Sequence, residues 1–264
     1  MHPLLNIAVT AARAAGRIIV RYLDRVDTLD VSTKYLNEFV TKVDQEAEAI
    51  IIADIRKAYP QHAILAEESG AAGESEYRWI IDPLDGTTNY LHGFPQFCVS
   101  IALEHRGRLD QGVVFDPLRQ ELFTASRGAG ARLDDRRIRV SRQTSLEGSL
   151  LGTGFPFRGD YDLDTYLETV RALVPKSAGI RRAGAAALDL AYVAAGRLDG
   201  FWEFGLEPWD MAAGVLLIRE AGGLTTDADG DEHYMESGNI VTGSPRVLRE
   251  LVKVIKPIWK ARAL

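Results

Sequence analysis

The segment WIIDPLDGTTN, residues 79–89, constrains the fold more than any other part of the chain. An apolar run typical of a buried strand ends abruptly in Asp82 and Asp85, so two carboxylates emerge together from one strand end. Pro83 restricts the backbone between them, and Gly86 permits a tight turn from which a helix can start. A turn of this kind directs backbone N–H groups at an anion. The segment therefore predicts a sheet with an acidic functional site at the end of one strand.

Two more acids follow the preceding strand, in the string AEESG, as Glu67 and Glu68. Adjacent strand ends would bring them beside Asp82 and Asp85. Ionised carboxylates gathered in this way repel one another unless a cation compensates them. Oxygen ligands without a Cys or His pattern favour Mg²⁺ or Mn²⁺ over zinc. The alternative for the first string taken alone is an Asp-rich turn that only caps a helix.

A second acidic position lies in EPWDMAAGVLLIREAGG, residues 207–223. Pro208 is typical of the first position of a helix, and Asp210 falls in the first turn of that helix. An acid there interacts favourably with the helix dipole, so Asp210 by itself is compatible with a purely structural cap.

Hydrophobic periodicity predicts amphipathic helices over residues 4–23 and 44–59, with a polar, turn-like stretch holding Lys34 and Asn37 between them. Strands are predicted at residues 63–66, 79–81, 98–103, 112–115 and 122–125. The later part predicts strands at 150–153, 201–204 and 239–242, with helices at 165–173, 185–195, 208–221 and 245–256. We expect two mixed halves, residues 1–145 and 146–264, that share one compact body.

Composition excludes several classes of function. The chain has 264 residues, 46% of them hydrophobic, and 31 Lys and Arg against 37 Asp and Glu give a net charge of −6. This charge disfavours direct DNA binding. The single cysteine, Cys98, cannot form an internal disulfide and is expected to pack in the core of a cytoplasmic protein. Arg13, Arg17 and Arg21 interrupt the first apolar pattern, so no export signal is expected. The longest stretch without charged residues, 86–103, contains polar and turn-forming residues, so no membrane span is expected either.

These motifs resemble those of the inositol monophosphatase family, and particularly of its bacterial SuhB-type branch. The resemblance rests on AEES, WIIDPLDGTTN and PWDMAAGVLLIREAGG, and it extends through TGFPF and GAAALDLAYVAAGRLDGFWE to nearly the whole chain. It implies a mixed α/β (α+β) fold, a layered αβαβα sandwich of the inositol monophosphatase and sugar phosphatase type.

The resemblance also implies roles for individual residues. The metal ligands would be Glu67, Asp82, the Leu84 carbonyl, Asp85 and Asp210, binding two or three Mg²⁺ ions with Mn²⁺ as a substitute. Catalysis would involve Glu67, the Thr87 hydroxyl and Asp44. Substrate contacts would come from Asp85, Gly86, Thr87, Ala186, Glu203 and Asp210, with Lys34 in a mobile loop. Two Mg²⁺ ions would balance the four carboxylates before a phosphate dianion enters.

The expected activity is hydrolysis of myo-inositol monophosphate and related polyol phosphates by metal-activated water, with lithium inhibition and a homodimer as further family expectations. One alternative is a fructose-1,6-bisphosphatase or nucleotide 3′-phosphatase of the same fold. Inositol monophosphate is favoured because Glu203 offers a carboxylate for vicinal hydroxyls and no Arg or Lys cluster awaits a second phosphate. Another alternative is an accessory factor that binds RNA polymerase and Nus factors in ribosomal RNA transcription antitermination, with Arg181 and Arg182 in the contact surface.

Overall fold

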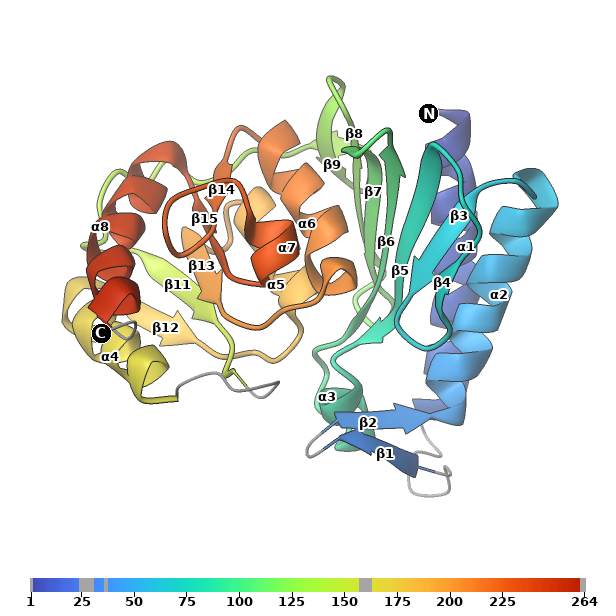
Figure 1. Ribbon diagram of the computed structural model, residues 1–264, viewed down its shortest axis with the longest axis horizontal. Coiled ribbons are helices and arrows are strands. Elements are labelled where there is room, and N and C mark those ends of the chain that lie inside the picture. Colours follow the sequence, from blue (N-terminus) through green and yellow to red (C-terminus); the bar gives the residue numbers. More distant parts are fainter. Residues whose placement is uncertain (1, 24–30, 36–37, 157–162, 262–264) are drawn as a thin grey trace.

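The computed structural model describes residues 2–23, 31–35, 38–156 and 163–261, and only the backbone of residues 31–35 and 38–40. Its elements form five layers, helix, sheet, helix, sheet, helix (Figure 1). This arrangement confirms the αβαβα sandwich that the resemblance implies.

The first two layers come from the N-terminal half. Helices α1 (Pro3–Leu23) and α2 (Lys42–Ala58) cover one face of an eight-stranded sheet. The strands run in the order β10 (Arg136–Arg137), β9 (Gly130–Leu133), β8 (Glu121–Ser126), β7 (Arg108–Asp116), β6 (Cys98–His105), β5 (Tyr77–Asp85), β3 (Ala63–Ala66) and β4 (Gly70–Ala72). Short helix α3 (Thr87–Leu91) follows β5 directly.

The other layers come from the C-terminal half. Helices α5 (Ala186–Ala194) and α6 (Pro208–Glu220) lie between the two sheets. The second sheet has the order β12 (Gly179–Arg181), β11 (Leu150–Thr153), β13 (Gly200–Glu203), β15 (Ile240–Gly243) and β14 (Leu224–Thr226). Helices α4 (Leu163–Leu173) and α8 (Pro245–Ala261) form the outer layer, and 3₁₀ helix η2 (Val174–Lys176) and α7 (Tyr234–Ser237) complete the elements.

The first sheet is apolar on both faces, which explains the continuous apolar run of β5. Trp79 and Ile81 pack into the core beneath α1 and α2, whereas Ile80 packs into the core around α5 and α6. Side chains alternate between the faces of a strand, so a strand covered by helices on both sides needs apolar residues at every position.

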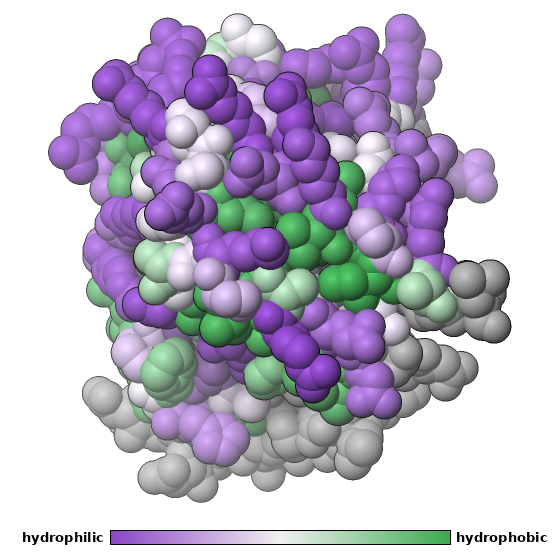
Figure 2. All heavy atoms as spheres, turned by 90° about the vertical axis from the view of Figure 1, so that its left-hand side faces the viewer, coloured by the Kyte–Doolittle hydropathy of each residue, from purple (hydrophilic) through white to green (hydrophobic). Residues whose placement is uncertain are grey.

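A third core lies between the second sheet and the outer helices, and it includes Trp202 and Trp259. Figure 2 shows this outer side, where apolar surface is surrounded by polar side chains. The exposed large apolar residues of α4 and η2 are Leu163, Leu167 and Val174.

One expectation needs correction. The stretch expected to be turn-like forms an antiparallel hairpin of β1 (Val31–Tyr35) and β2 (Glu38–Thr41), so Lys34 lies in a strand; its side chain lies outside the described residues. Helix α1 is long and apolar enough to cross a membrane by length and composition alone. Its apolar side nevertheless packs against α2 and the sheet, which makes α1 a core helix.

Candidate metal and phosphate site

Acidic residues from three segments meet at one end of the first sheet. Strands β3 and β5 are parallel neighbours, and the N–H of Glu67, just after β3, donates to the carbonyl of Ile81 over 3.1 Å. Asp82 and Asp85 follow in β5, and Asp210 comes from α6. One carboxylate oxygen from each of these three aspartates lies within 4.8 Å of the others. The four acids singled out in the sequence are therefore brought together.

A β-bulge allows Asp82 and Asp85 to reach the same cluster. Asp82 pairs with Ser100 of β6, whereas Asp85 pairs with Cys98, so β5 contains one extra residue. In a regular strand, residues three apart point to opposite faces. The bulge removes this alternation, and it holds Pro83, which has no N–H to contribute to the ladder.

Asp210 caps a helix and belongs to the acidic cluster at the same time. Pro208 occupies the first turn of α6, and the N–H of Glu207 donates to Oδ2 of Asp210 over 2.8 Å. The structural and functional interpretations of this residue are therefore compatible.

Burial makes the acidic cluster electrostatically costly. Asp82 and Asp85 are only 1% and 8% exposed. Burial, followed by the charges of Glu67, Asp85 and Asp210, raises the pKa of Asp82 well above its usual range. Burial and the charge of Asp210 raise the pKa of Asp85 to about 7. A cluster of this kind is stabilised by protons or by a cation.

The donor set fits a hard divalent cation. The ligand atoms on offer are carboxylate oxygens and, next to them, the carbonyl of Leu84, which lines the same cavity. Oxygen ligands of this type suit Mg²⁺ and Mn²⁺. Glu67, Asp82, Asp85 and Asp210 are the residues that would hold such an ion.

Half-buried Thr87 and buried Asp44 form a pair beside the cluster. The Thr87 hydroxyl lies 3.0 Å from Oδ1 of Asp44 and 3.0 Å from the Leu84 carbonyl, so it can donate to either oxygen. Oδ2 of Asp44 accepts from the N–H of Thr41 over 2.8 Å, in a capping box at the start of α2. Burial raises the pKa of Asp44, although its hydrogen bonds oppose the shift.

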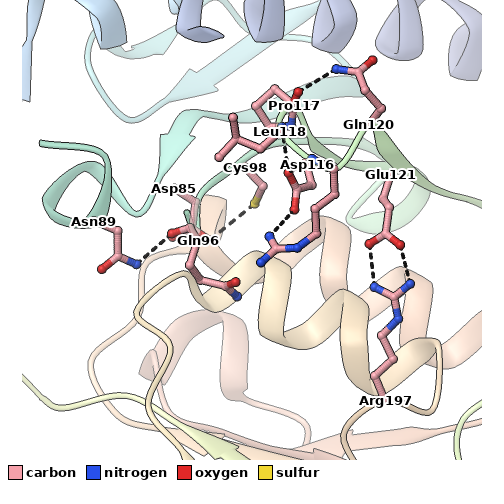
Figure 3. Close-up of polar contacts among 11 residues, drawn as sticks. Asp85, Asn89, Gln96, Cys98, Asp116, Pro117, Leu118, Gln120, Glu121 and Arg197 are labelled. Atoms are coloured by element: carbon pink, nitrogen blue, oxygen red, sulfur yellow. Dashed lines mark hydrogen bonds and ion pairs between the residues drawn. The ribbon is translucent and has the colours of Figure 1, made fainter. Parts of the chain in front are cut away.

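The turn after β5 is fixed by packing. Gly86 has φ of 91°, and a Cβ at this position would lie 2.8 Å from the carbonyl of Gln96. Asn89 donates through Nδ2 to Gln96 and to the carbonyls of Ala183 and Gly184, which joins α3 to the segment before α5. Figure 3 shows Asn89 directed at Gln96.

The acids line a cavity of about 560 Å³ that takes residues from both halves of the chain. Ala186, Glu203, Phe155 and Arg182 line the same cavity. Burial, then the charges of Asp210, Asp189 and Asp85, raises the pKa of Glu203 well above its usual range. The cavity therefore places a polar acceptor, Glu203, in the same space as the acidic cluster.

Several contacts at the site have no clear signal in the sequence. Cys98 is buried in the core as expected, but its thiol also donates to Oδ2 of Asp85 over 3.6 Å (Figure 3). The N–H of Ala187 donates to the same oxygen over 2.8 Å. Arg182 lies over the ring of Phe155, 4.9 Å from its centroid. These contacts join residues distant in the chain, so no local pattern reports them.

Several known proteins share both sequence and fold with this chain. A curated relative from Pseudomonas aeruginosa, named Nus factor SuhB, is 57% identical over 263 residues, with 97% of each chain covered. A crystal structure of extragenic suppressor protein SuhB from Bartonella henselae matches with a TM-score of 0.93 at 47% identity, covering 96% of this chain and 98% of that one.

An inositol monophosphatase from Anabaena (Nostoc) matches with a TM-score of 0.84 at 40% identity, covering 99% of this chain and 98% of that one. The model of the inositol monophosphatase family matches residues 1–262. The chain therefore belongs to the inositol monophosphatase family, a family of phosphatases.

Proposed function

We propose that the chain is a Mg²⁺-dependent phosphomonoesterase that hydrolyses myo-inositol monophosphate and related polyol phosphates to the free polyol and phosphate. The observation that carries this proposal is the buried cluster of Asp82, Asp85 and Asp210 in a cavity that also holds Glu203. A cluster of anions with no cation would repel a phosphate, whereas the same cluster loaded with divalent ions attracts one.

Glu67, Asp82, Asp85, Asp210 and the Leu84 carbonyl would hold the ions, with Mn²⁺ as a substitute. When bound, the metal supplies positive charge that acidifies a water molecule and offsets charge on the phosphoryl group. The Thr87 hydroxyl, held by Asp44, would orient the attacking water and pass its proton toward the buried carboxylate. This role places Thr87 and Asp44 at the nucleophile side of the phosphate.

The remaining contacts would position the substrate. Backbone groups of Gly86 and Thr87 would face the phosphate, and Ala186 and Glu203 would face the polyol hydroxyls. Among the described residues that line the cavity, Arg182 is the one Arg or Lys side chain. One cation suits a monophosphate better than a bisphosphate, which supports inositol monophosphate over fructose 1,6-bisphosphate.

The test is phosphate release from inositol 1-phosphate with and without Mg²⁺, for the wild type beside Asp85→Asn. We expect Mg²⁺-dependent release that is lost in the variant, because the amide removes one negative ligand without changing shape. A substrate panel that ranked bisphosphates above inositol monophosphate would contradict the substrate assignment. Full activity of the double variant Asp85→Asn, Asp210→Asn would contradict the mechanism itself.

We propose a second role as a Nus factor, because the 57% identical relative carries that name across nearly its whole length. The partners would be RNA polymerase and other Nus factors, with Arg181 and Arg182, both exposed, in the contact surface. Co-purification of RNA polymerase with the catalytically inactive Asp85→Asn protein tests this role separately from catalysis. If neither the wild type nor the Asp85→Asn protein retained RNA polymerase, that result would count against this role.

Three further proposals complete this assignment: a homodimer, a cytoplasmic location, and two halves, residues 1–145 and 146–264, that act as one body. The last is supported by the cavity, which takes lining residues from both halves.

A further inference from the structure

Glu48 is a buried acid that the proposed mechanism does not use. It lies on α2 and is 4% exposed. Oε2 of Glu48 accepts the backbone N–H of Glu68 over 2.8 Å, and Oε1 accepts the N–H of Ser69 over 2.9 Å. The two oxygens of this side chain therefore accept hydrogen bonds from two successive N–H groups of a single turn.

That turn carries Glu67. It connects β3 to β4, with Ala66 paired to Gly70, so residues 67–69 form a tight three-residue loop. The N–H of Glu67 is held from the other side by the Ile81 carbonyl. Glu67 is thus fixed by β5 on one side and by Glu48 on the other, which leaves its backbone little freedom to rotate.

Helix α2 also contacts a second part of the site, through Asp44, which lies one helical turn before Glu48. Asp44 and Glu48 are four residues apart and therefore lie on the same side of the helix. Asp44 contacts Thr87, and Glu48 holds the turn after Glu67. One rigid helix face therefore sets the spacing between the segment that holds Glu67 and the segment that holds Thr87.

We propose that Glu48 is a positioning residue that orients Glu67 toward the divalent cation. This inference rests on the proposed function, because it assumes that Glu67 is a metal ligand. A carboxylate is suited to the task since it accepts at both oxygens, whereas an amide would turn its NH₂ group toward one of the two N–H donors. Partners that orient metal ligands typically change metal affinity by 10- to 100-fold when they are replaced.

The test is Mn²⁺ binding to the metal-free protein, measured by calorimetry, for the wild type, Glu48→Gln and Glu46→Gln. Glu46 is the matched control, because it lies on the same helix but is partly exposed and pairs with Lys42 and Arg21. We expect Glu48→Gln to weaken Mn²⁺ binding by about tenfold or more, and Glu46→Gln to leave it unchanged. Saturating Mg²⁺ should restore most of kcat in Glu48→Gln, because the defect lies in metal affinity.

A second variant, Glu48→Asp, keeps the inference testable if Glu48→Gln does not fold. Glu48→Asp keeps the charge but shortens the reach, so we expect a smaller loss of affinity in the same direction. If Glu48 only stabilised the turn, its replacement would lower the melting temperature without changing the Mn²⁺ dissociation constant. That result would overturn the inference. If the wild type itself bound no Mn²⁺, the proposed metal site would fail instead, so the two failures are distinguishable.

Discussion

The backbone N–H of Ala187 donates to Oδ2 of Asp85 over 2.8 Å, joining two residues that are 102 positions apart. Ala187 lies in the first turn of α5, where N–H groups lack partners within the helix. The N-cap residue, Ala185, has no side chain that could satisfy them. Asp85 therefore caps α5 from another segment, as Asp210 caps α6 from within. The acids of the site also hold the central helices, so variants that test their chemistry must keep their shape.

The acidic cluster predicts that the metal-free protein loses stability as pH rises. Folding raises the pKa of Asp85 to about 7, and the pKa of Asp82 also rises. The folded state therefore binds more protons than the unfolded state between about pH 4 and pH 7, and the free energy of unfolding falls across that window. For Asp85 alone, the loss is at most about 4 kcal/mol.

Thermal melts of chelator-treated protein between about pH 5 and pH 8, with and without Mg²⁺, measure this effect. Mg²⁺ competes with protons for the same oxygens, so its stabilising effect should be larger at the higher pH. Asp85→Asn should flatten the pH dependence of the metal-free protein. A melting temperature that climbed from pH 5 to pH 8 without metal would contradict the prediction.

Thr87 supplies a second prediction. Thr87→Ala removes the hydroxyl that lies 3.0 Å from Oδ1 of Asp44, and we expect kcat to fall by roughly 100-fold, the scale of a lost proton-transfer group. Thr87→Ser keeps the hydroxyl and should retain most activity. Asp44→Asn combined with Thr87→Ala should cost little more than either change alone, because the two residues act as a unit. Additive losses in the double variant would show that they act separately.

Sequence patterns predicted the long elements and the acidic cluster well. Residues 63–66 and 150–153 were predicted as strands and form β3 and β11, because their apolar runs end at clear turn residues. A helix was predicted from residue 245 to about residue 256, yet α8 continues through Pro257 to Ala261. Short edge strands such as β4, β10 and β12 were missed, since two or three residues carry no periodic signal.

At the site, too, features with a local sequence motif were predicted and features that depend on distant contacts were not. Asp82 and Asp85 stand in one local motif and were recognised from it, whereas the bulge that directs them together depends on pairing with β6. The sequence around Glu48 gives no sign of its role, because its partners, the N–H groups of Glu68 and Ser69, are twenty and twenty-one residues away. Every residue except proline carries a backbone N–H, so the sequence does not show which N–H groups a side chain contacts. Such contacts can be identified only once the fold is known.

Gly16 predicts a stability effect that is independent of the site. A Cβ at Gly16 of α1 would lie 2.6 Å from the Phe115 ring and 3.1 Å from Pro117, so the helix approaches β7 closely there. Gly16→Ala should lower the free energy of unfolding by about 1–3 kcal/mol, the usual cost of overpacking. Urea denaturation measures it, with the exposed neighbour Arg17→Ala as the control. Equal stability of both variants would show that α1 can move away from the sheet.

Gly154 and Glu203 give the last prediction, which concerns substrate recognition. A Cβ at Gly154 would lie about 2 Å from the Glu203 carboxylate, so an alanine there must displace that carboxylate. Glu203 is proposed to face the polyol hydroxyls rather than the reacting phosphate, so we expect it to bind equally in the ground state and the transition state. Loss of such an interaction raises KM with kcat unchanged.

Gly154→Ala and Glu203→Gln should therefore both raise KM for inositol 1-phosphate, by roughly tenfold for one lost hydrogen bond, and leave kcat within about twofold. Hydrolysis of a phosphate ester without vicinal hydroxyls should be insensitive to either change, because it offers Glu203 nothing to bind. If Gly154→Ala lowered kcat for both substrates alike, the glycine would act on the phosphate side of the cavity, and the assignment of Glu203 to the polyol would lose its support.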